Sequence, residues 1–191
     1  MTKIFIGLLY ALFGIAALFA SDKVDSFFVI ISNYKEFACS VKVVQYSQFD
    51  TIIDNGFIVW NNKNFFAHLG DEFFLRDSTG EFLTWSEGGD AMPSENEFVF
   101  GDFVRMQEKL TKKFSLLANF TKNSEKLLGA AKSDENPIAK FLIVLDSKNK
   151  IDKISLWDRM DIRTDIIFDN PLKKMPDKST FTLPAGVDIV R

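Results

Sequence analysis

The last third of the chain, residues 141–191, constrains the fold most, because it consists of short apolar runs separated by polar turns. Apolar and charged side chains alternate there, with Ile162, Ile166 and Phe168 on one predicted face and Asp161, Arg163 and Asp165 on the other. A strand with one solvated and one apolar face has this period of two. The run STFTL (179–183) predicts a further strand, which Pro184 and Gly186 end. No catalytic motif accompanies these strands, so this region indicates binding rather than chemistry.

Residues 1–20 have the layout of a secretory signal peptide, with Lys3, an apolar run and then small residues. We expect cleavage after Ala20 and export of a single domain formed by residues 21–191. The alternative is a transmembrane anchor. The apolar run of about 17 residues is at the short limit for a membrane span, and no stop-transfer pattern follows it.

The chain carries 23 Lys and Arg against 26 Asp and Glu, without a basic block. This balance argues against nucleic acid as a partner and against a permanent electrostatic attachment to anionic lipid headgroups. Cys39 is the only cysteine, so no intramolecular disulfide can form and the core alone must stabilise the domain. About 170 residues suffice for one such core, and we expect a monomer.

Two stretches have the apolar spacing of an amphipathic helix. The first spans 22–35 and places on one face Val24, Phe27, Phe28 and Ile31. The second follows a long loop at 86–101, begins near Asp102 and places on one face Phe103, Met106, Leu110 and Phe114. Both stripes fit helices that pack on a sheet.

The segments around these helices predict antiparallel strands. Alternation over 37–45 predicts one face formed by Phe37, Cys39, Val41 and Val43, which makes the cysteine a small buried apolar residue. Polar clusters predict turns at Asn55–Gly56, NNKN (61–64), Gly70–Asp71 and DSTG (77–80). Tight turns between short strands are typical of an up-and-down sheet. Two more strands are expected at 115–121 and 126–132, followed by a turn at 133–137.

Residues suited to catalysis are sparse. His68 is the only histidine, and no His and Cys cluster offers ligands to a metal ion. The chain has neither a phosphate-binding glycine loop nor a GxSxG motif, so we expect no cofactor and no enzymatic activity. Asp158 and Asp161 could serve acid–base chemistry, but nothing in the sequence separates them from ordinary turn acids.

Several of these stretches resemble the LolA family of periplasmic lipoprotein carriers. They are the first helix with Phe37, Cys39 and Val41 after it, then GFIVW (56–60), KNFF (63–66), DSTGEFLTW (77–85), DRMDIRTDIIF (158–168), DNPL (169–172) and FTLPAGVDIV (181–190). The resemblance implies an α+β fold, in which helices cover the concave face of an open (incomplete) antiparallel β-barrel.

The resemblance also implies a function, which is to bind the acyl chains of lipoproteins in a hydrophobic cavity and carry them through the periplasm from the inner to the outer membrane. The implied partners are acylated lipoproteins, an inner-membrane ABC transporter of the LolCDE type and an outer-membrane receptor of the LolB type. In the better-studied members an Arg latches the helical lid shut. Asn62 stands at that place here, with Lys63 next to it, so a latch formed by these two residues departs from the family pattern.

We expect the acyl cavity to be lined by the two helical stripes and by one face of the sheet. The predicted lining residues are Val24, Phe28, Ile31, Val41, Ile58, Trp60, Phe66, Leu75, Trp85, Phe103, Met106 and Leu110. Ile58, Trp60 and Phe66 follow from aligning GFIVW and KNFF with inward-facing positions of the family. Two other functions remain open. One is a cavity protein of the same fold that senses lipoproteins or carries another lipid, and the other is a small periplasmic hydrolase that uses His68 and an acid.

Overall fold

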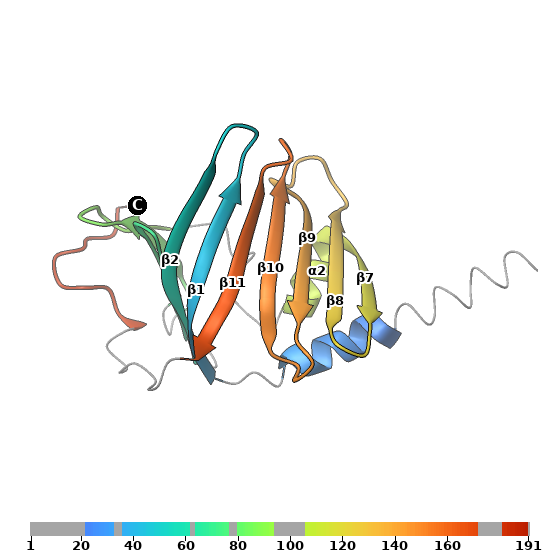
Figure 1. The fold of residues 1–191 in the computed structure, drawn as a ribbon. Helices are drawn as coiled ribbons and strands as arrows, with labels where there is room; N and C mark the ends of the chain where they lie inside the picture. Colours follow the sequence, from blue (N-terminus) through green and yellow to red (C-terminus); the bar gives the residue numbers. More distant parts are fainter. Residues whose placement is uncertain are drawn as a thin grey trace, which may run out of the picture.

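The computed structural model describes residues 22–32, 36–61, 64–76, 80–93, 106–171 and 181–190. Within these residues the chain forms one 11-stranded antiparallel sheet and two short helices (Figure 1). The predicted signal peptide and residues 94–105, which include Asp102 and Phe103, lie outside the described residues.

The sheet consists of two meanders that lie side by side. The strands are β1 (Glu36–Tyr46), β2 (Thr51–Asn61), β3 (Asn64–Leu69), β4 (Glu72–Arg76), β5 (Phe82–Ser86), β6 (Met92–Pro93), β7 (Phe114–Phe120), β8 (Glu125–Ala131), β9 (Ile138–Leu145), β10 (Ile151–Asp158) and β11 (Arg163–Pro171). Their order in the sheet is β6-β5-β4-β3-β2-β1-β11-β10-β9-β8-β7. The first meander consists of β1–β6 and the second of β7–β11. β1 pairs with both β2 and β11 and so joins the two meanders, whereas β6 and β7 form the edges and leave the described sheet open.

Both helices lie behind the β7–β10 part of the sheet in Figure 1. The N-terminal helix spans residues 22–32, and α2 spans Met106–Lys113. Their apolar stripes are buried, which confirms the helical spacing read from the sequence at Phe27, Ile31 and Leu110. These side chains belong to the same hydrophobic cluster as one face of the sheet.

Two hydrophobic clusters occupy opposite faces of the sheet. The larger one, called the interior cluster here, combines the helical stripes with sheet residues that include Cys39, Val41, Ile58, Trp60, Phe65, Ala67, Phe82, Phe114, Leu127, Phe141, Ile154 and Ile166. The smaller one, called the outer cluster, comprises Ala38, Val59, Phe66, Leu75, Leu83, Trp85, Ala91 and Phe181. Successive residues of a strand point to opposite faces, so each of the strands β1–β5 contributes side chains to both clusters.

The turn predicted at Asn55–Gly56 is wrong. β2 runs through these residues without a break, because it pairs with β1 along its whole length, from Asn61 opposite Glu36 to Thr51 opposite Tyr46. A Cβ on Gly56 would lie 2.0 Å from the His68 carbonyl oxygen, so this glycine permits close backbone approach rather than a turn.

The turn between β1 and β2 instead occupies residues 47–50. There the Ser47 amide donates to the Asp50 carbonyl at 2.9 Å. The turns predicted at Gly70–Asp71 and at 133–137 are confirmed. The strands on either side of 62–63 and of 77–79 pair antiparallel, in agreement with the two remaining predictions, although those residues lie outside the described ranges.

Three further expectations differ in detail. α2 ends at Lys113, so Phe114 begins β7 instead of closing the helix, although it stays in the interior cluster with its ring 5.0 Å from that of Phe141. Phe181–Leu183 is not a strand, and the tail pairs through a parallel bridge between Ala91 and Ile189. Asp165 occupies the predicted face but is only 3% exposed, because Lys153 and Arg163 lie over it at 3.8 and 3.3 Å.

The close approach at Gly56 can be tested by adding a single methyl group. We predict that Gly56→Ala lowers the free energy of unfolding by at least about 1–3 kcal/mol, because a backbone carbonyl at that position cannot move aside without disturbing the β2–β3 pairing. The measurement is chemical denaturation followed by circular dichroism. Gly89→Ala is the control, because its Cβ would meet nothing closer than the Ser86 carbonyl at 3.4 Å, and it should change stability by under about 0.5 kcal/mol. Equal effects of the two substitutions would contradict the proposed role of Gly56.

Candidate functional site

The interior cluster has an aromatic centre set by the pairing of three strands. Trp60 of β2 lies opposite Phe37 of β1 and Phe65 of β3, and its ring is 6.4 Å from the ring of Phe65. In the neighbouring row, Ile58 lies between Cys39 and Ala67. Residues opposite each other in an antiparallel pair share a face, so these rows present a continuous apolar surface to the helices.

A pocket of about 280 Å³ opens at the end of the sheet where β1 and β10 begin and β11 ends. Its lining residues are Glu36, Phe37, Ala38, Cys39, Lys150, Ile151, Phe168 and Asp169. The Phe37 and Phe168 rings lie 6.4 Å apart, and both side chains pack against the interior cluster. The charged members come from the strand ends, so the pocket has apolar walls that continue into the core and a polar rim.

A bulge shapes this pocket. The pairing of β1 with β11 shifts between Cys39, which lies opposite Pro171, and Val41, which lies opposite Phe168. One extra residue on β11 interrupts the ladder beside the pocket, where Asp169 forms part of the lining. Bulges of this kind redirect side chains near binding sites.

Cys39 lies in the pocket wall as a buried thiol. Burial raises its pKa from 9.0 to about 12, because the low-dielectric surroundings disfavour the thiolate. The thiol is therefore protonated at neutral pH and is a poor nucleophile, in agreement with the small buried apolar residue expected from the sequence.

Eight predicted lining residues lie together in the interior cluster. They are Val24, Phe28, Ile31, Val41, Ile58, Trp60, Met106 and Leu110. Phe103 and the two predicted latch residues, Asn62 and Lys63, lie outside the described residues.

Phe66, Leu75 and Trp85 are on the opposite face, in the outer cluster, so their assignment to the same surface as Trp60 is wrong. The error is one of register. Asn61 pairs with Asn64 across the two-residue connection, which places Phe65 opposite Trp60 and turns Phe66 to the other side. A shift of one residue exchanges the faces of a whole strand. Leu75 follows Phe66, because the two residues are paired.

The chain terminus closes the outer cluster. Phe181 is buried against it, and Leu183 and Val187 pack on it. The Ala91 amide donates to the Asp188 carbonyl at 2.8 Å, and the Val190 amide donates to the Ala91 carbonyl at 2.9 Å. The outer cluster is therefore a packed structural core rather than a site.

The sequence did not single out Phe37, Ile151 and Phe168 as lining residues of a site. The alternation of apolar and charged residues gave the correct face for Phe37 and Phe168, which both pack against the interior cluster. That pattern contains no information on which ends of distant strands meet. Residues 37, 151 and 168 come together only through the pairing of β1 with β11 and of β11 with β10.

Side chains suited to catalysis do not converge in the described residues. His68 stacks on Phe73 with a centroid separation of 4.2 Å and lies on the face opposite Trp60. Asp158 accepts hydrogen bonds from the amides of Met160 and Ile162, and Asp161 pairs with Lys140 at 3.2 Å, so both acids hold turns. No group of three or more His, Cys, Asp or Glu able to hold a metal ion occurs in this part of the chain.

Neither of the helices in the described ranges is long and apolar enough to cross a membrane. No protein-family model and no curated protein matches the chain. Solved structures similar to it include a LolA superfamily protein of Nitrosomonas europaea, with a TM-score of 0.47 and 10% identity over 84% of this chain and 98% of that one. A domain of Vibrio parahaemolyticus assigned to outer membrane lipoprotein sorting has a TM-score of 0.47 and 8% identity over 85% of this chain and 97% of the other. MucB has a TM-score of 0.47 and 11% identity over 90% of this chain, which spans 65% of MucB.

The burial of Cys39 predicts a slow thiol reaction. At pH 8 the thiol of the folded protein should react with a water-soluble aromatic disulfide about a thousandfold more slowly than that of the unfolded chain, because so little thiolate is present. The measurement is the absorbance of the released thiolate with and without denaturant. A rapid reaction of the folded protein would show that the pocket wall is open to solvent.

Proposed function

We propose that the protein is a periplasmic chaperone that binds the acyl chains of lipoproteins and carries them from the inner to the outer membrane. The observation that carries this proposal is the continuity between the apolar pocket at Phe37 and Phe168 and the interior cluster under the helices. If the pocket ended against polar side chains, or were separated from the interior cluster, an acyl chain could not extend inward from it. The sequence resemblance to LolA supplies the class of ligand.

The size of the pocket argues for a protein that opens to take its cargo. Ligand pockets commonly measure about 300–1,000 Å³, and 280 Å³ lies just below that range. The pocket therefore admits the end of an acyl chain, and a whole chain requires the helices to move off the sheet. Val24, Phe28 and Met106 would exchange their contacts with the sheet for contacts with the ligand.

The energetics favour such an exchange. Each buried methylene contributes roughly 0.8 kcal/mol, so a chain of about 16 carbons could bind with about 12 kcal/mol as an upper bound. Binding of that strength would prevent release. Helices that pack on the empty interior lower the apparent affinity by the free energy needed to open them. In this proposal the helices act as a lid on the concave face, and the ligand competes with them.

The proposal places the protein in the periplasm after removal of residues 1–20, where it acts without a cofactor and without catalysis. The implied partners are an inner-membrane ABC transporter of the LolCDE type as donor and a LolB-type receptor as acceptor. Asn62 and Lys63 stand where the family has its latch, and in this proposal the packing of the helical stripes replaces the latch.

Phe168→Glu tests the pocket. We expect this variant to lose most of its ability to release acylated lipoproteins from inner-membrane spheroplasts, because a carboxylate would stand in the apolar wall that the chain must pass. The measurement is the fraction of a labelled lipoprotein recovered in the soluble phase with purified protein. Retention of the fold is checked by circular dichroism.

Leu117→Glu is the matched control. Leu117 is an apolar residue of β7 that is 55% exposed and belongs to neither cluster, so the same charge there should leave release unchanged. Release by folded Phe168→Glu at the wild-type level would exclude the pocket as the route of the acyl chain.

The hydrolase alternative makes the opposite prediction for His68. We expect His68→Ala to support lipoprotein release as well as the wild type does, with a modest loss of stability from the missing stack on Phe73. The measurements are the same release assay and a thermal denaturation curve. A fully stable His68→Ala protein without activity would instead favour a chemical role for this residue.

A further inference from the structure

The end of the sheet opposite the pocket carries four exposed apolar side chains on two neighbouring turns. Phe49 in the β1–β2 turn is 96% exposed, and Met160 in the β10–β11 turn is 72% exposed. Ile52 and Ile53, just after the first turn, are 52% and 53% exposed. Figure 1 shows both turns at the same end of the sheet, away from the N-terminal helix. Exposed apolar side chains gathered in this way mark contact surfaces.

The turn that carries Phe49 is held firmly. Ser47 accepts hydrogen bonds through its hydroxyl from the Phe49 amide at 3.3 Å and from the Asp50 amide at 3.0 Å. The Asp50 carboxylate accepts from the Thr51 amide at 2.7 Å. These local bonds fix the backbone around the exposed ring, so contact with a partner costs little further ordering.

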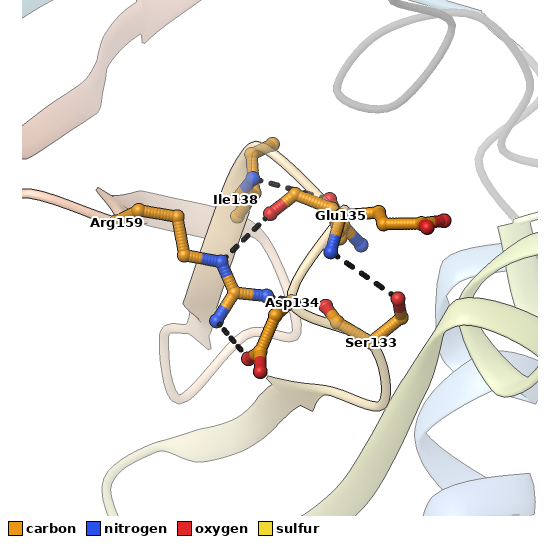
Figure 2. A network of polar contacts seen from close by, with 6 residues as sticks. Ser133, Asp134, Glu135, Ile138 and Arg159 are labelled. Atoms are coloured by element: carbon orange, nitrogen blue, oxygen red, sulfur yellow. Dashed lines mark hydrogen bonds and ion pairs between the residues drawn. The ribbon is translucent and has the colours of Figure 1, made fainter.

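The second turn is fixed by Arg159, as Figure 2 shows. Its guanidinium donates to the Asn136 carbonyl at 2.9 Å and to the Asp134 carboxylate at 3.2 Å, which Figure 2 draws as dashed lines. It also donates to the Ser133 carbonyl. The β10–β11 turn is thereby tied to the loop between β8 and β9. Met160, the next residue, is thus presented from a braced backbone.

A row of alternating aromatic and cationic side chains crosses the sheet just behind the two turns. Tyr46 pairs with Arg163, which pairs with Trp157, which pairs with Lys140, so all four share the outer face. The Arg163 guanidinium lies 4.1 Å from the centre of the Tyr46 ring, and the Lys140 ammonium lies 4.9 Å from that of Trp157. A pocket of about 370 Å³ between the turns includes Tyr46, Trp157, Met160 and Arg163 in its lining.

This order of side chains matches the layers of a bilayer surface. From the end of the sheet inward, the exposed apolar side chains Phe49 and Met160 are followed by the row that contains Tyr46 and Trp157. Tyr and Trp are enriched at the level of lipid headgroups, and the long cationic side chains of the same row can extend toward phosphates. Both cations of the row are already paired with acids, Lys140 with Asp161 at 3.2 Å and Arg163 with Asp165 at 3.3 Å. The row therefore carries little net charge, and the exposed apolar side chains must contribute most of the attraction to lipid. The most exposed apolar side chains, Phe49 and Met160, stand on turns at the end of the sheet and not on a sheet face. The arrangement therefore favours lipid over a second protein as the occupant.

We propose that this end of the molecule docks on the surface of a phospholipid bilayer, with Phe49 and Met160 inserted among the acyl chains and the Tyr46–Arg163–Trp157–Lys140 row at the headgroups. The interaction is shallow and reversible, because it rests on a few side chains rather than on a buried helix face. It concerns the opposite end of the sheet from the acyl pocket and does not depend on which cargo that pocket takes.

Vesicle binding tests the proposal directly. The exported protein, with its N-terminus verified by mass spectrometry, is mixed with vesicles of phosphatidylethanolamine and phosphatidylglycerol or of phosphatidylcholine alone, and its bound fraction is measured by flotation. We expect binding to both kinds of vesicle that persists at high salt, because apolar contact contributes most of it. Phe49→Ser should weaken binding about tenfold, and the double variant with Met160→Ser should weaken it further.

Two controls make the result specific. Leu117→Ser removes an apolar side chain of β7 that is 55% exposed and lies away from the two turns, and this variant should bind as the wild type does. Fluorescence gives the orientation, because Trp60 and Trp85 are buried and Trp157 lies in the headgroup row. Bromine-labelled lipids should therefore quench the partly exposed Trp157, and replacement of Trp157 by Phe should abolish the quenching.

Three results would overturn the proposal. They are the absence of vesicle binding by the wild-type protein, wild-type binding by Phe49→Ser, and a wild-type dimer that Phe49→Ser converts to a monomer while vesicle binding is unaltered. The last result would show that the end of the sheet that carries Phe49 and Met160 contacts a second copy of the chain. A negative result in the vesicle assay would not affect the prediction for lipoprotein release. Wild-type release by Phe168→Glu would not affect the prediction for vesicle binding, so the two proposals can be rejected separately.

Discussion

The pairing of β1 with both β2 and β11 is the constraint on which the rest of the structure depends. It joins two meanders into one sheet and fixes Phe37, Cys39 and Val41 on the same face as Trp60 and the helical stripes. A shift of one residue in this register would turn that apolar row outward. The bulge between Cys39 and Val41 interrupts the same pairing locally, and the apolar pocket lies at that interruption. The strand that organises the core therefore also determines where the core opens.

The interior and outer clusters pack against different parts of the chain. The outer cluster is closed by the chain terminus, which is held by hydrogen bonds through Ala91 and by the buried ring of Phe181. The interior cluster includes the apolar stripes of two short helices, which pack on it through side chains. The hydrogen bond between Gln107 and Asp25 at 2.7 Å joins the two helices to each other. Packing through side chains can be exchanged for an apolar ligand at lower cost than a bonded strand can be removed.

Much of the fold could be predicted from local patterns. The stripes Phe27–Ile31 and Met106–Leu110 gave the helices, the alternation in 37–45 gave β1 and its faces, and Gly70–Asp71 gave a real turn. The errors arose where a local signal competes with pairing. Asn55–Gly56 has the composition of a turn, but full-length pairing with β1 keeps it extended. Phe66 is as apolar and as large as a pocket residue should be, but the pairing across 62–63 places Phe65 opposite Trp60 on the interior face and Phe66 on the other face.

The sequence by itself determined that the chain forms an antiparallel sheet with two amphipathic helices and which residues of β1 and β11 are apolar. These properties follow from the order of side chains along one strand or helix, which fixes what a single element can bury. Only the tertiary structure decided which apolar faces meet, where the pocket opens, and that the turns carrying Phe49 and Met160 lie at the same end of the sheet (Figure 1). Such meetings depend on pairing between strands more than a hundred residues apart, as in β1 and β11, and no local pattern specifies that register.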